Sequence, residues 1–407
     1  MKKTLALILS FVMILALAAC GQSVENTASP DAAPLPAEET ESNVKIGLIC
    51  LHDENSTYDL NFINAFKEAC EKTGAEYLIK TNVPESADAY AAAAELADNG
   101  CDIVFADSFG HEDHIIEAAQ EFPNVEFCHA TGTKAHTEGI PNYHNAFASI
   151  YEGRYLDGIA AGMKLKQMAD SGEIEYDGAK VGYVGAHPYA EVISGYTSFF
   201  LGVRRMFPEA TMEVTFTGSW YDETAEKEAA TRLINDGCVV ISGHADSMGA
   251  PTACEQNGVP FVFYNGSVEK ACPNTYIVST KINWAPYFEY IINCKKNGEP
   301  IAADWTGTFA DGSVEMTSVN EKAAAPGTAD TINGLAADFK NGTIHVFDVN
   351  TFTVNRETLS SYMADVDTDP AYEGDTEAIS GGYFHESEYR SAPYFDLKID
   401  GIILIDE

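Results

Sequence analysis

Short apolar runs and amphipathic segments alternate along the chain from residue 44 onward, and this alternation limits the possible folds more than any other feature. Residues 44–51 form the first apolar run. Residues 62–70 then place apolar side chains at the i, i+3, i+4, i+7 and i+8 positions of one helical face, which ends near Gly74. Strands and helices in turn, at this spacing, predict a parallel sheet covered on both faces. Further strands are expected at residues 76–79, 103–106, 125–130, 180–185, 212–216, 239–242 and 261–264, and further helices at residues 89–99, 113–121, 154–168, 192–206 and 225–235.

The pattern starts again near residue 180, which predicts an α/β protein with two doubly wound, Rossmann-like lobes. A strand at 276–280 and a helix at 286–297 are expected to return to the first lobe, so that the chain crosses the hinge several times. Apolar runs at 344–349 and 395–405 predict strands and turns near the end of the chain. The expected domains are a signal peptide with its cleavage motif at 1–20, a disordered tether at 21–43, an N-terminal lobe at 44–147, a C-terminal lobe at 148–264, a hinge and return to the N-terminal lobe at 265–340, and a C-terminal extension at 341–407.

The N-terminus has the charged-then-apolar order of an export signal. Lys2 and Lys3 precede an apolar run at 5–19, and the run ends in Leu-Ala-Ala-Cys, which resembles the bacterial lipobox. We therefore expect cleavage before Cys20, acylation of Cys20, and anchoring at the outer face of the cell membrane. Residues 21–43 are rich in Ala, Pro, Glu, Ser and Thr and cannot bury a core, which predicts a flexible tether. A plain secretory signal, with Cys20 incidental, is the alternative.

Charge excludes several classes of partner. The chain has 62 acidic and 24 basic side chains, a formal net charge of −38. This charge repels the phosphate backbone of DNA and RNA and the surface of anionic membranes. The body of the chain also has no run of twenty apolar residues, which excludes a polytopic membrane protein. The partner is expected to be neutral, cationic or a protein.

The sequence gives little support for a metal or a cofactor. Eight cysteines remain when Cys20 is set aside, and none forms a CxxC or CxxH pair, so we interpret them as small buried apolar side chains rather than a disulfide framework. His111 and His114 have the i, i+3 spacing that could place two metal ligands on one helical face. The solvated start of a helix, with acidic residues favourable to its dipole, is the preferred interpretation.

Catalytic and nucleotide-binding motifs are absent from the sequence. It has no GxxxxGK[ST], no GxGxxG after the first strand and no GxSxG. His244 and Asp246 could form a catalytic pair, but no serine or cysteine with an activating context accompanies them. A loop that contacts a ligand is the preferred interpretation, and no catalytic residue is predicted.

The loops that follow the expected strands are the candidate pocket, because ligands of open parallel sheets bind beyond the carboxyl ends of the strands. Aromatic side chains alternate there with amides and carboxylates, a mixture that suits a planar heterocycle stacked between rings and hydrogen-bonded at its edge. For Tyr58, Phe109 and Trp220 taken singly, core packing is an equal alternative. The loops are residues 52–58, 107–110, 129–132, 187–189, 219–222, 243–247 and 265–266.

Several of these segments, in this order and spacing, resemble the basic membrane lipoprotein family of ABC-transporter substrate-binding proteins. The resemblance covers about residues 44–300, and the lipobox agrees with it. It implies a type I periplasmic-binding fold, in which two lobes close on a ligand, and it implies a purine base or purine nucleoside as the ligand. The segments are DSFG at 107–110, HATG at 129–132, YEGRYL at 151–156, PYAEVISGYTSFFLGVR at 188–204, SWYD at 219–222, EKEAA at 226–230, HADS at 244–247 and NWAPY at 283–287.

The resemblance also implies roles for individual residues. Tyr58 stands where an aromatic ring of the N-terminal lobe stacks on the base, and Trp220 stands where a ring of the other lobe stacks on its opposite face. Asp246 lies in the loop whose backbone approaches the ligand, and Asn265 stands where an acidic residue holds the ribose or the purine edge. The full set of expected ligand contacts is His52, Tyr58, Ser108, Phe109, Thr131, Trp220, His244, Asp246, Asn265 and Trp284.

Two departures from the family pattern leave base and nucleoside both open as ligands. Nucleoside binders have an Asp soon after the first strand, where this chain has Cys50-Leu51-His52. Their ribose-binding lysine falls near Lys281 or Ile282. The SWYD and HADS segments are closer to the branch that binds free bases.

Together these features predict a lipid-anchored substrate-binding protein that holds a purine base or nucleoside and passes it to an ABC permease, without catalysis, cofactor or metal. Two alternatives remain. A nucleoside hydrolase would need a positioned acid, base or metal, and the loops after the strands have no Asp-rich cluster for one. A sensory receptor would use the same pocket to signal to a membrane partner.

Overall fold

The computed structural model describes residues 43–367, 374 and 376–405. From residue 43 these residues belong to one compact unit. The predicted signal peptide, the lipobox with Cys20 and nearly all of the predicted tether lie outside them. Within the described part of the chain, no helix combines the length and the apolar character needed to cross a membrane.

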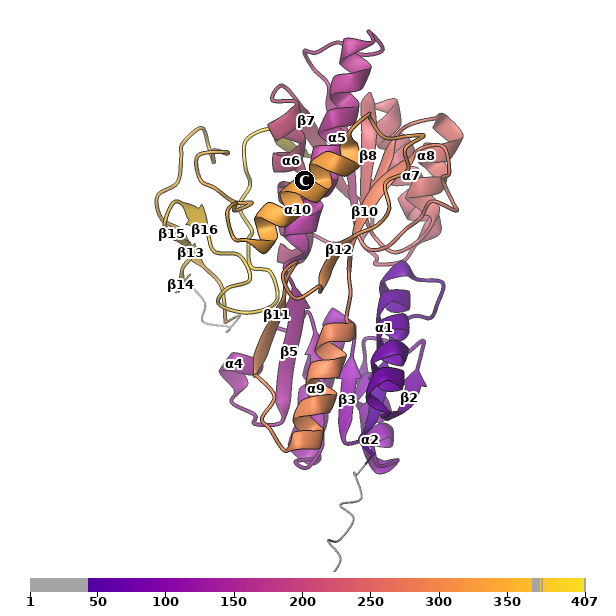
Figure 1. Cartoon of the computed structure of the whole chain (residues 1–407), viewed down its shortest axis with the longest axis vertical. Helices are drawn as coiled ribbons and strands as arrows, with labels where there is room; N and C mark the ends of the chain where they lie inside the picture. Colours follow the sequence, from indigo (N-terminus) through magenta and orange to yellow (C-terminus); the bar gives the residue numbers. More distant parts are fainter. Residues whose placement is uncertain (1–42, 368–373, 375, 406–407) are drawn as a thin grey trace, which may run out of the picture. The chain divides into compact units, whose positions relative to one another are not determined.

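The first lobe is built on a six-stranded parallel sheet with the order β11-β5-β4-β3-β1-β2. Helices cover both faces, because alternate residues of the buried strands point to two separate apolar layers. Helices α1 and α9 lie side by side on one face (Figure 1), and α2 and α3 pack together on the other. The elements are β1 Lys45–Ile49, α1 Thr57–Thr73, β2 Glu76–Lys80, α2 Ala87–Asp98, β3 Ile103–Ala106, η1 Phe109–His111, α3 Glu112–Glu121, β4 Glu126–Ala130, α4 Ala135–Glu138, β5 Tyr143–Ala148, α9 Ala285–Asn297 and β11 Asp304–Gly307.

The second lobe is built on a seven-stranded sheet with the order β12-β10-β9-β8-β6-β7-β17, in which only β12 is antiparallel to its neighbour. Helices α5 and α6 pack closely on each other, and α7 packs on α8. A Cβ atom on Gly158 would lie 1.9 Å from the carbonyl oxygen of Phe199, so only glycine permits this approach. The elements are α5 Ile150–Asp170, β6 Lys180–Gly185, α6 Ala190–Met206, β7 Thr211–Phe216, α7 Glu223–Asn235, β8 Cys238–His244, α8 Gly249–Asn257, β9 Phe261–Phe263, β10 Tyr276–Ile282, β12 Val314–Met316, α10 Thr328–Lys340 and β17 Ile402–Leu404.

The chain passes between the lobes after β5, after β10 and after β11. The strand predicted at 276–280 is therefore not part of the first lobe. It is β10 of the second sheet, where it pairs with β9 and β12, and only the helix that follows, α9, returns to the first lobe. A buried Arg154 anchors the start of α5 to the second sheet, with Nη1 donating to Asp157 at 2.6 Å and to the Phe263 carbonyl at 2.7 Å.

The C-terminal residues form less regular structure than predicted. The run at 344–349 contains no strand apart from a bridge of Asp348 to Tyr383, and of the run at 395–405 only β17 is a strand. Phe347 and Phe395 stack with their ring centroids 4.2 Å apart, so aromatic packing rather than a sheet holds this region. Two short antiparallel strand pairs complete it, β13 Met363–Ala364 with β14 Thr376–Glu377 and β15 Ile379–Ser380 with β16 Tyr383–Phe384.

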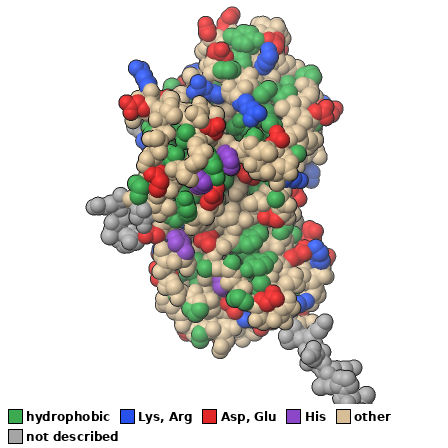
Figure 2. Space-filling view, turned by 60° about the vertical axis from the view of Figure 1, so that its left-hand side comes forward, with side chains coloured by type: hydrophobic (Ala, Val, Ile, Leu, Met, Phe, Trp, Pro, Cys, Tyr) green, Lys and Arg blue, Asp and Glu red, His purple; other side chains and the backbone are tan. Residues whose placement is uncertain are grey.

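The eight cysteines of the described residues are buried and none forms a disulfide, as the sequence predicted. His111, by contrast, is not at a solvated helix start. Its ring is buried, its Nε2 lies 2.9 Å from the Val83 carbonyl, and burial lowers its pKa to about 4. Acidic side chains are spread over the face shown in Figure 2 rather than gathered in one patch.

Candidate ligand-binding site

The two lobes meet at a cleft that contains two adjoining cavities. The inner cavity is narrow, with a volume of about 20 Å³, whereas the outer cavity, at about 520 Å³, is within the range of about 300–1,000 Å³ typical of small-molecule sites. The inner cavity lies at the carboxyl ends of strands from both sheets, the position where such folds bind ligands. Its lining comprises Leu51, His52, Tyr58, Asp59, Ser108, Phe109 and Thr131 from the first lobe and Glu191, Trp220, Asp246 and Tyr264 from the second.

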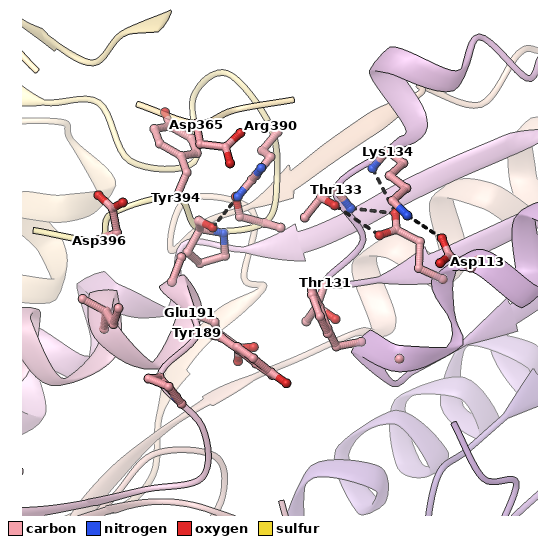
Figure 3. A pocket seen from close by; sticks show the side chains of 18 residues that line it. Asp113, Thr131, Thr133, Lys134, Tyr189, Glu191, Asp365, Arg390, Tyr394 and Asp396 are labelled. Atoms are coloured by element: carbon pink, nitrogen blue, oxygen red, sulfur yellow. Dashed lines mark hydrogen bonds and ion pairs between the residues drawn. The ribbon is translucent and has the colours of Figure 1, made fainter. Parts of the chain in front are cut away.

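The outer cavity is the wider of the two and shares Phe109, Thr131 and Glu191 with the inner cavity. Figure 3 shows three parts of the chain converging on it: the loop after β4, the start of α6 and the C-terminal segment. The two cavities are therefore separated only by the side chains of the three residues that they share. The lining comprises Phe109, Gly110, Glu112, Asp113, Thr131, Thr133, Lys134, Pro188, Tyr189, Ala190, Glu191, Ile193, Asp365, Arg390, Ala392, Pro393, Tyr394 and Asp396.

Most of the site residues predicted from the sequence come together at the inner cavity. These residues are far apart in the sequence, and they come together because the carboxyl ends of the strands of both sheets face the cleft. Those in its lining are His52, Tyr58, Ser108, Phe109, Thr131, Trp220 and Asp246. His244, Asn265 and Trp284 lie elsewhere.

Tyr58 and Trp220 line the inner cavity from opposite lobes. Tyr58 is the second residue of α1, whose N-cap Ser56 accepts a hydrogen bond from the Asp59 amide at 3.2 Å. Its hydroxyl donates to the Asp107 carbonyl at 2.7 Å, which fixes the ring. Trp220 follows β7, and its ring lies edge-on to that of His187, with centroids 5.3 Å apart.

Asp246 supplies a polar edge to the same cavity. The Tyr264 hydroxyl donates a hydrogen bond to Oδ1 of Asp246, and the Asp246 amide donates to the Trp220 carbonyl at 2.8 Å. Burial raises the pKa of Asp246 well above its usual range. A carboxyl group can accept hydrogen bonds from the edge of a heterocycle and, in its protonated form, which burial favours here, can also donate one.

Thr131 has the backbone conformation that β-branched residues rarely adopt, with φ at 61°. Its hydroxyl donates to the Ala130 carbonyl at 2.6 Å, and its amide donates to the Ala146 carbonyl at 3.2 Å. The next residue must be small, because a Cβ atom on Gly132 would lie 1.8 Å from Nδ2 of Asn145. This strained turn brings Thr131 to the wall of both cavities.

A buried acidic cluster lies beneath the first-lobe wall. Cys50, Asp59 and Asp107 have ligand-type atoms within 4.8 Å of one another, and Oδ2 of each aspartate has no hydrogen-bond partner. Burial and then the charge of Asp59 raise the pKa of Asp107 well above its usual range. Burial alone would also raise the pKa of Asp59, but hydrogen bonds from His52 and Ser56 lower it. The pair can therefore share one proton, and with Cys50 it has the donor set for a small cation.

Trp284 is not a pocket residue, contrary to the prediction. It is 1% exposed, and its ring stacks on that of Phe62 at 4.3 Å, next to Phe105. The reason is topological: the chain has already left the second lobe after β10, so Trp284 begins α9 inside the core of the first lobe.

Asn265 and Lys281 also lie away from both cavities. Oδ1 of Asn265 accepts from Nδ2 of Asn61 at 2.6 Å and from the Ile282 amide at 3.3 Å, so Asn265 joins the second lobe to α1 of the first. Lys281 forms an ion pair with Glu315 at 2.9 Å. Oδ1 of Asn265 and Nζ of Lys281 are therefore engaged within the protein, whereas Nδ2 of Asn265 is buried without a hydrogen-bond partner among the described residues.

His244 lies behind the inner cavity rather than in its lining. Its ring stacks on that of Tyr264 with centroids 4.0 Å apart, and its Nδ1 lies 2.8 Å from the Tyr183 hydroxyl. Its Nε2 lies 3.7 Å from Oε1 of Glu191. Burial lowers the pKa of His244, which favours the neutral ring. This ring contacts two lining residues, Tyr264 and Glu191.

Four lining residues were not predicted, namely Leu51, Asp59, Glu191 and Tyr264. Tyr264 was assigned to the preceding strand, and the carboxyl end of that strand was the available signal. Glu191 belongs to the first turn of α6, where the sequence predicted neither helix nor loop contact.

Two doubly wound lobes, with a cleft lined from both sides at the carboxyl ends of their strands, are the architecture of two-lobed solute-binding proteins. Solved structures share this fold. An ABC-transporter solute-binding protein from Conexibacter woesei DSM 14684 has a TM-score of 0.60 at 21% identity, covering 74% of this chain and 98% of that one. One from Aeropyrum pernix K1 has a TM-score of 0.63 at 16% identity, covering 75% and 93%. The predicted fold class is confirmed.

Residues 46–346 match the Bmp family, described as ABC transporter substrate-binding protein PnrA-like, and the chain belongs to this family. A purine-binding protein of Brucella abortus (strain 2308) is 33% identical over 258 residues, 62% of this chain and 69% of the relative. A putative ABC transporter glucose-binding protein of Haloferax volcanii is 32% identical over 194 residues, 48% of this chain and 46% of the relative. The protein is thus the substrate-binding protein of an ABC transporter and not an enzyme, which excludes the nucleoside hydrolase.

Proposed function

We propose that this protein binds a purine base or purine nucleoside between its lobes and delivers it to an ABC permease. The observation that carries the proposal is the inner cavity, where Tyr58 and Trp220 come from opposite lobes and Asp246 supplies a polar edge. Two aromatic side chains and a carboxyl group in the lining of one cavity suit a flat heterocycle with donors and acceptors on its rim. The purine-binding relative from Brucella abortus supports the same class of ligand.

The charge of the inner cavity supports an uncharged ligand. Among the described residues that line it, His52, Asp59, Glu191 and Asp246 are titratable besides the tyrosines, and none is Lys or Arg. A phosphate group would meet carboxylates there without a compensating cation. Purine bases and nucleosides lack that group.

Closure of the two lobes is the proposed mechanism of capture. A ligand in contact with both lobes stabilises the closed state relative to the open one, because only the closed state makes both sets of contacts. The three passages of the chain between the lobes would form the hinge. The permease would then recognise the closed, loaded protein.

Export and lipid anchoring belong to the same proposal. The lipobox residues 17–20 lie between an apolar run and the tether, and ABC-type capture at the outer face of a membrane requires a protein held close to its permease. Acylation of Cys20 would supply that anchor.

Native mass spectrometry of the purified mature protein, followed by calorimetric titration, tests the ligand class. The panel is adenine, guanine, hypoxanthine, adenosine, guanosine, inosine and glucose. At least one purine is expected to bind with micromolar affinity or better. Binding of glucose, with no purine bound, would overturn the proposal and leave the fold unaffected.

A further inference from the structure

The C-terminal segment, defined as the described residues 347–367 and 376–405, lies beyond the part of the chain that matches the family. It nevertheless forms one wall of the outer cavity. Asp365, Arg390, Tyr394 and Asp396 of this segment are in the lining of the cavity, and in Figure 3 Arg390 and Tyr394 lie across from the loop with Thr133 and Lys134, with Glu191 below them. The ligand cleft of this protein therefore has a third wall in addition to its two lobes.

Bonds to both lobes hold this wall in place. The Ser391 amide donates to Oδ1 of Asp304 at 2.6 Å, and the Thr306 hydroxyl donates to the Ser387 carbonyl at 3.1 Å, which attaches the segment to β11 of the first lobe. At its end, β17 pairs in parallel with β7 of the second lobe. A wall fixed at both ends can present side chains to a ligand at defined positions.

Arg390 stabilises the C-terminal segment through hydrogen bonds within it. Its guanidinium donates to the carbonyls of Val366 at 2.7 Å, Pro393 at 2.9 Å and Ala392 at 3.1 Å. The other cation of the outer cavity, Lys134, forms an ion pair with Asp113. Both cations among the described lining residues are therefore already engaged.

The carboxylates of the outer cavity outnumber its cations, with Glu112, Asp113, Glu191, Asp365 and Asp396 in the lining against Lys134 and Arg390. Glu191 and Asp396 are two of these carboxylates. Asp396 accepts a hydrogen bond from the Tyr362 hydroxyl at 2.5 Å. Carboxylates accept hydrogen bonds from hydroxyl groups and repel phosphate. The chemistry of this cavity thus fits an uncharged group with several hydroxyls.

We propose that the outer cavity is the subsite for the sugar of a nucleoside, and that the C-terminal segment determines this specificity. The inference rests on the proposed function, because it places the purine in the inner cavity and leads the sugar outward past Phe109 and Thr131, which line both cavities. The ion pair of Lys281 with Glu315 supports it, since a lysine at the ribose-binding position of the family is then engaged within the protein. An unphosphorylated nucleoside binds more tightly than its base or its 5′-monophosphate.

The test compares Asp396→Arg with Glu357→Arg in the full mature chain. Asp396 lines the outer cavity, whereas Glu357 is an exposed residue of the same segment outside both cavities, so the two variants make the same charge change. Calorimetry measures the dissociation constants of adenosine, adenine and AMP, or the guanine series if that is the ligand. Asp396→Arg is expected to weaken the nucleoside about tenfold, to leave the base nearly unchanged and to improve the monophosphate.

Each outcome decides one claim. If Asp396→Arg changes base and nucleoside equally, or matches Glu357→Arg, the outer cavity is not the sugar subsite. If the parent binds a base as tightly as its nucleoside, the subsite is also wrong while the purine proposal stands. If the parent binds no purine, the proposed function itself fails. A thermal melt of each variant identifies a folding defect, and in that case Asp396→Asn, which should weaken only the nucleoside, replaces the charge reversal.

Discussion

The ring of Phe109, in the first lobe, lies 5.3 Å from the ring of Tyr189, in the second, with 32° between their planes. Both side chains are partly open to solvent, at 38% and 41% exposure, and both line the outer cavity. Phe109 also lines the inner cavity, so this pair lies where the two cavities join. An aromatic contact between lobes exists only while the lobes are closed, and it therefore favours the closed state, by about 0.5–1.5 kcal/mol for such a pair.

Tyr189→Ala should accelerate ligand release. Loss of the contact with Phe109 removes part of the preference for the closed state, so the dissociation rate constant should rise about twofold to twelvefold, as that energy implies. Stopped-flow displacement measures it. Tyr176→Ala is the matched control, because Tyr176 is 43% exposed and stacks on Phe207 outside both cavities. Equal release from the two variants would contradict a role for the pair.

Truncation of either aromatic residue of the inner cavity should weaken purine binding. We expect Tyr58→Ala and Trp220→Ala each to cost about 1–3 kcal/mol, the range for a base stacked on an aromatic side chain. Each should also reduce the ligand-induced compaction seen by small-angle scattering, because contacts from one lobe alone cannot favour closure.

Two comparisons make this prediction specific. Tyr58→Phe keeps the ring and removes only the hydrogen bond to the Asp107 carbonyl, so it should retain most of the affinity. Trp305→Phe alters a tryptophan of β11 that packs on Tyr287 and lines neither cavity. If Trp220→Ala binds and closes like the parent, stacking must be assigned to Phe109 and Tyr189 instead.

The sequence predicted strands well where apolar residues are continuous. Residues 103–106 and 180–185 have the predicted bounds, because each is a short apolar run ended by a loop. Strand β5 was missed because it contains His144 and Asn145. Both are buried, and Oδ1 of Asn145 accepts from the Ala135 amide at 2.7 Å. Partners distant in the chain make such a polar strand stable, and periodicity does not reveal them.

Two helices were missed for a similar reason. Helix α8 begins Gly-Ala-Pro, and α10 has Gly334 in its interior, both weak local signals for a helix. Packing of α10 against α5 and of α8 against α7 supplies the stability that composition does not.

The candidate site, like the fold, could be predicted only in part. Loops after strands could be recognised from the sequence, which is why Tyr58, Trp220 and Asp246 were predicted and lie at one cavity. Trp284 was misassigned because the sequence does not show where the chain passes from one lobe to the other, and this passage decides the lobe to which a loop belongs. The wall that contains Arg390 could not be foreseen, since nothing in residues 347–405 indicates the sheets to which they attach.

Substitution of Cys20 should release the protein from the membrane. Cys20 is the acceptor in the lipobox interpretation, so Cys20→Ala should move the protein from the membrane fraction to the soluble or secreted fraction. Mass spectrometry of the mature parent should find an acylated N-terminal cysteine. Cys70→Ala, at a buried cysteine of α1, controls for loss of a thiol. Equal fractionation of parent and Cys20→Ala, with no acyl mass, would contradict the anchor.

Glu226 should make the protein less stable as pH rises. This α7 side chain is buried and accepts hydrogen bonds from the Ser247 amide at 3.1 Å and the Asp222 amide at 3.4 Å. Burial, the larger effect, raises its pKa from 4.5 to about 7. Between these values the folded protein keeps a proton that the unfolded chain has lost. The contribution to stability is thus complete below pH 4.5 and is lost as pH rises through 7, with an upper limit of about 3 kcal/mol.

Urea unfolding of Glu226→Gln and of the parent at pH 5 and pH 8 tests this sign. Gln is neutral at both values, so the variant should lose less free energy of unfolding between pH 5 and pH 8 than the parent. Some loss should remain, because burial also raises the pKa of Asp107 and Asp246. Glu228→Gln, on the exposed face of the same helix, should behave like the parent. An identical pH dependence in Glu226→Gln and the parent would show that Glu226 is ionised in the folded state at pH 5, and the loop that contains Ser247 would then be held by a charged acceptor.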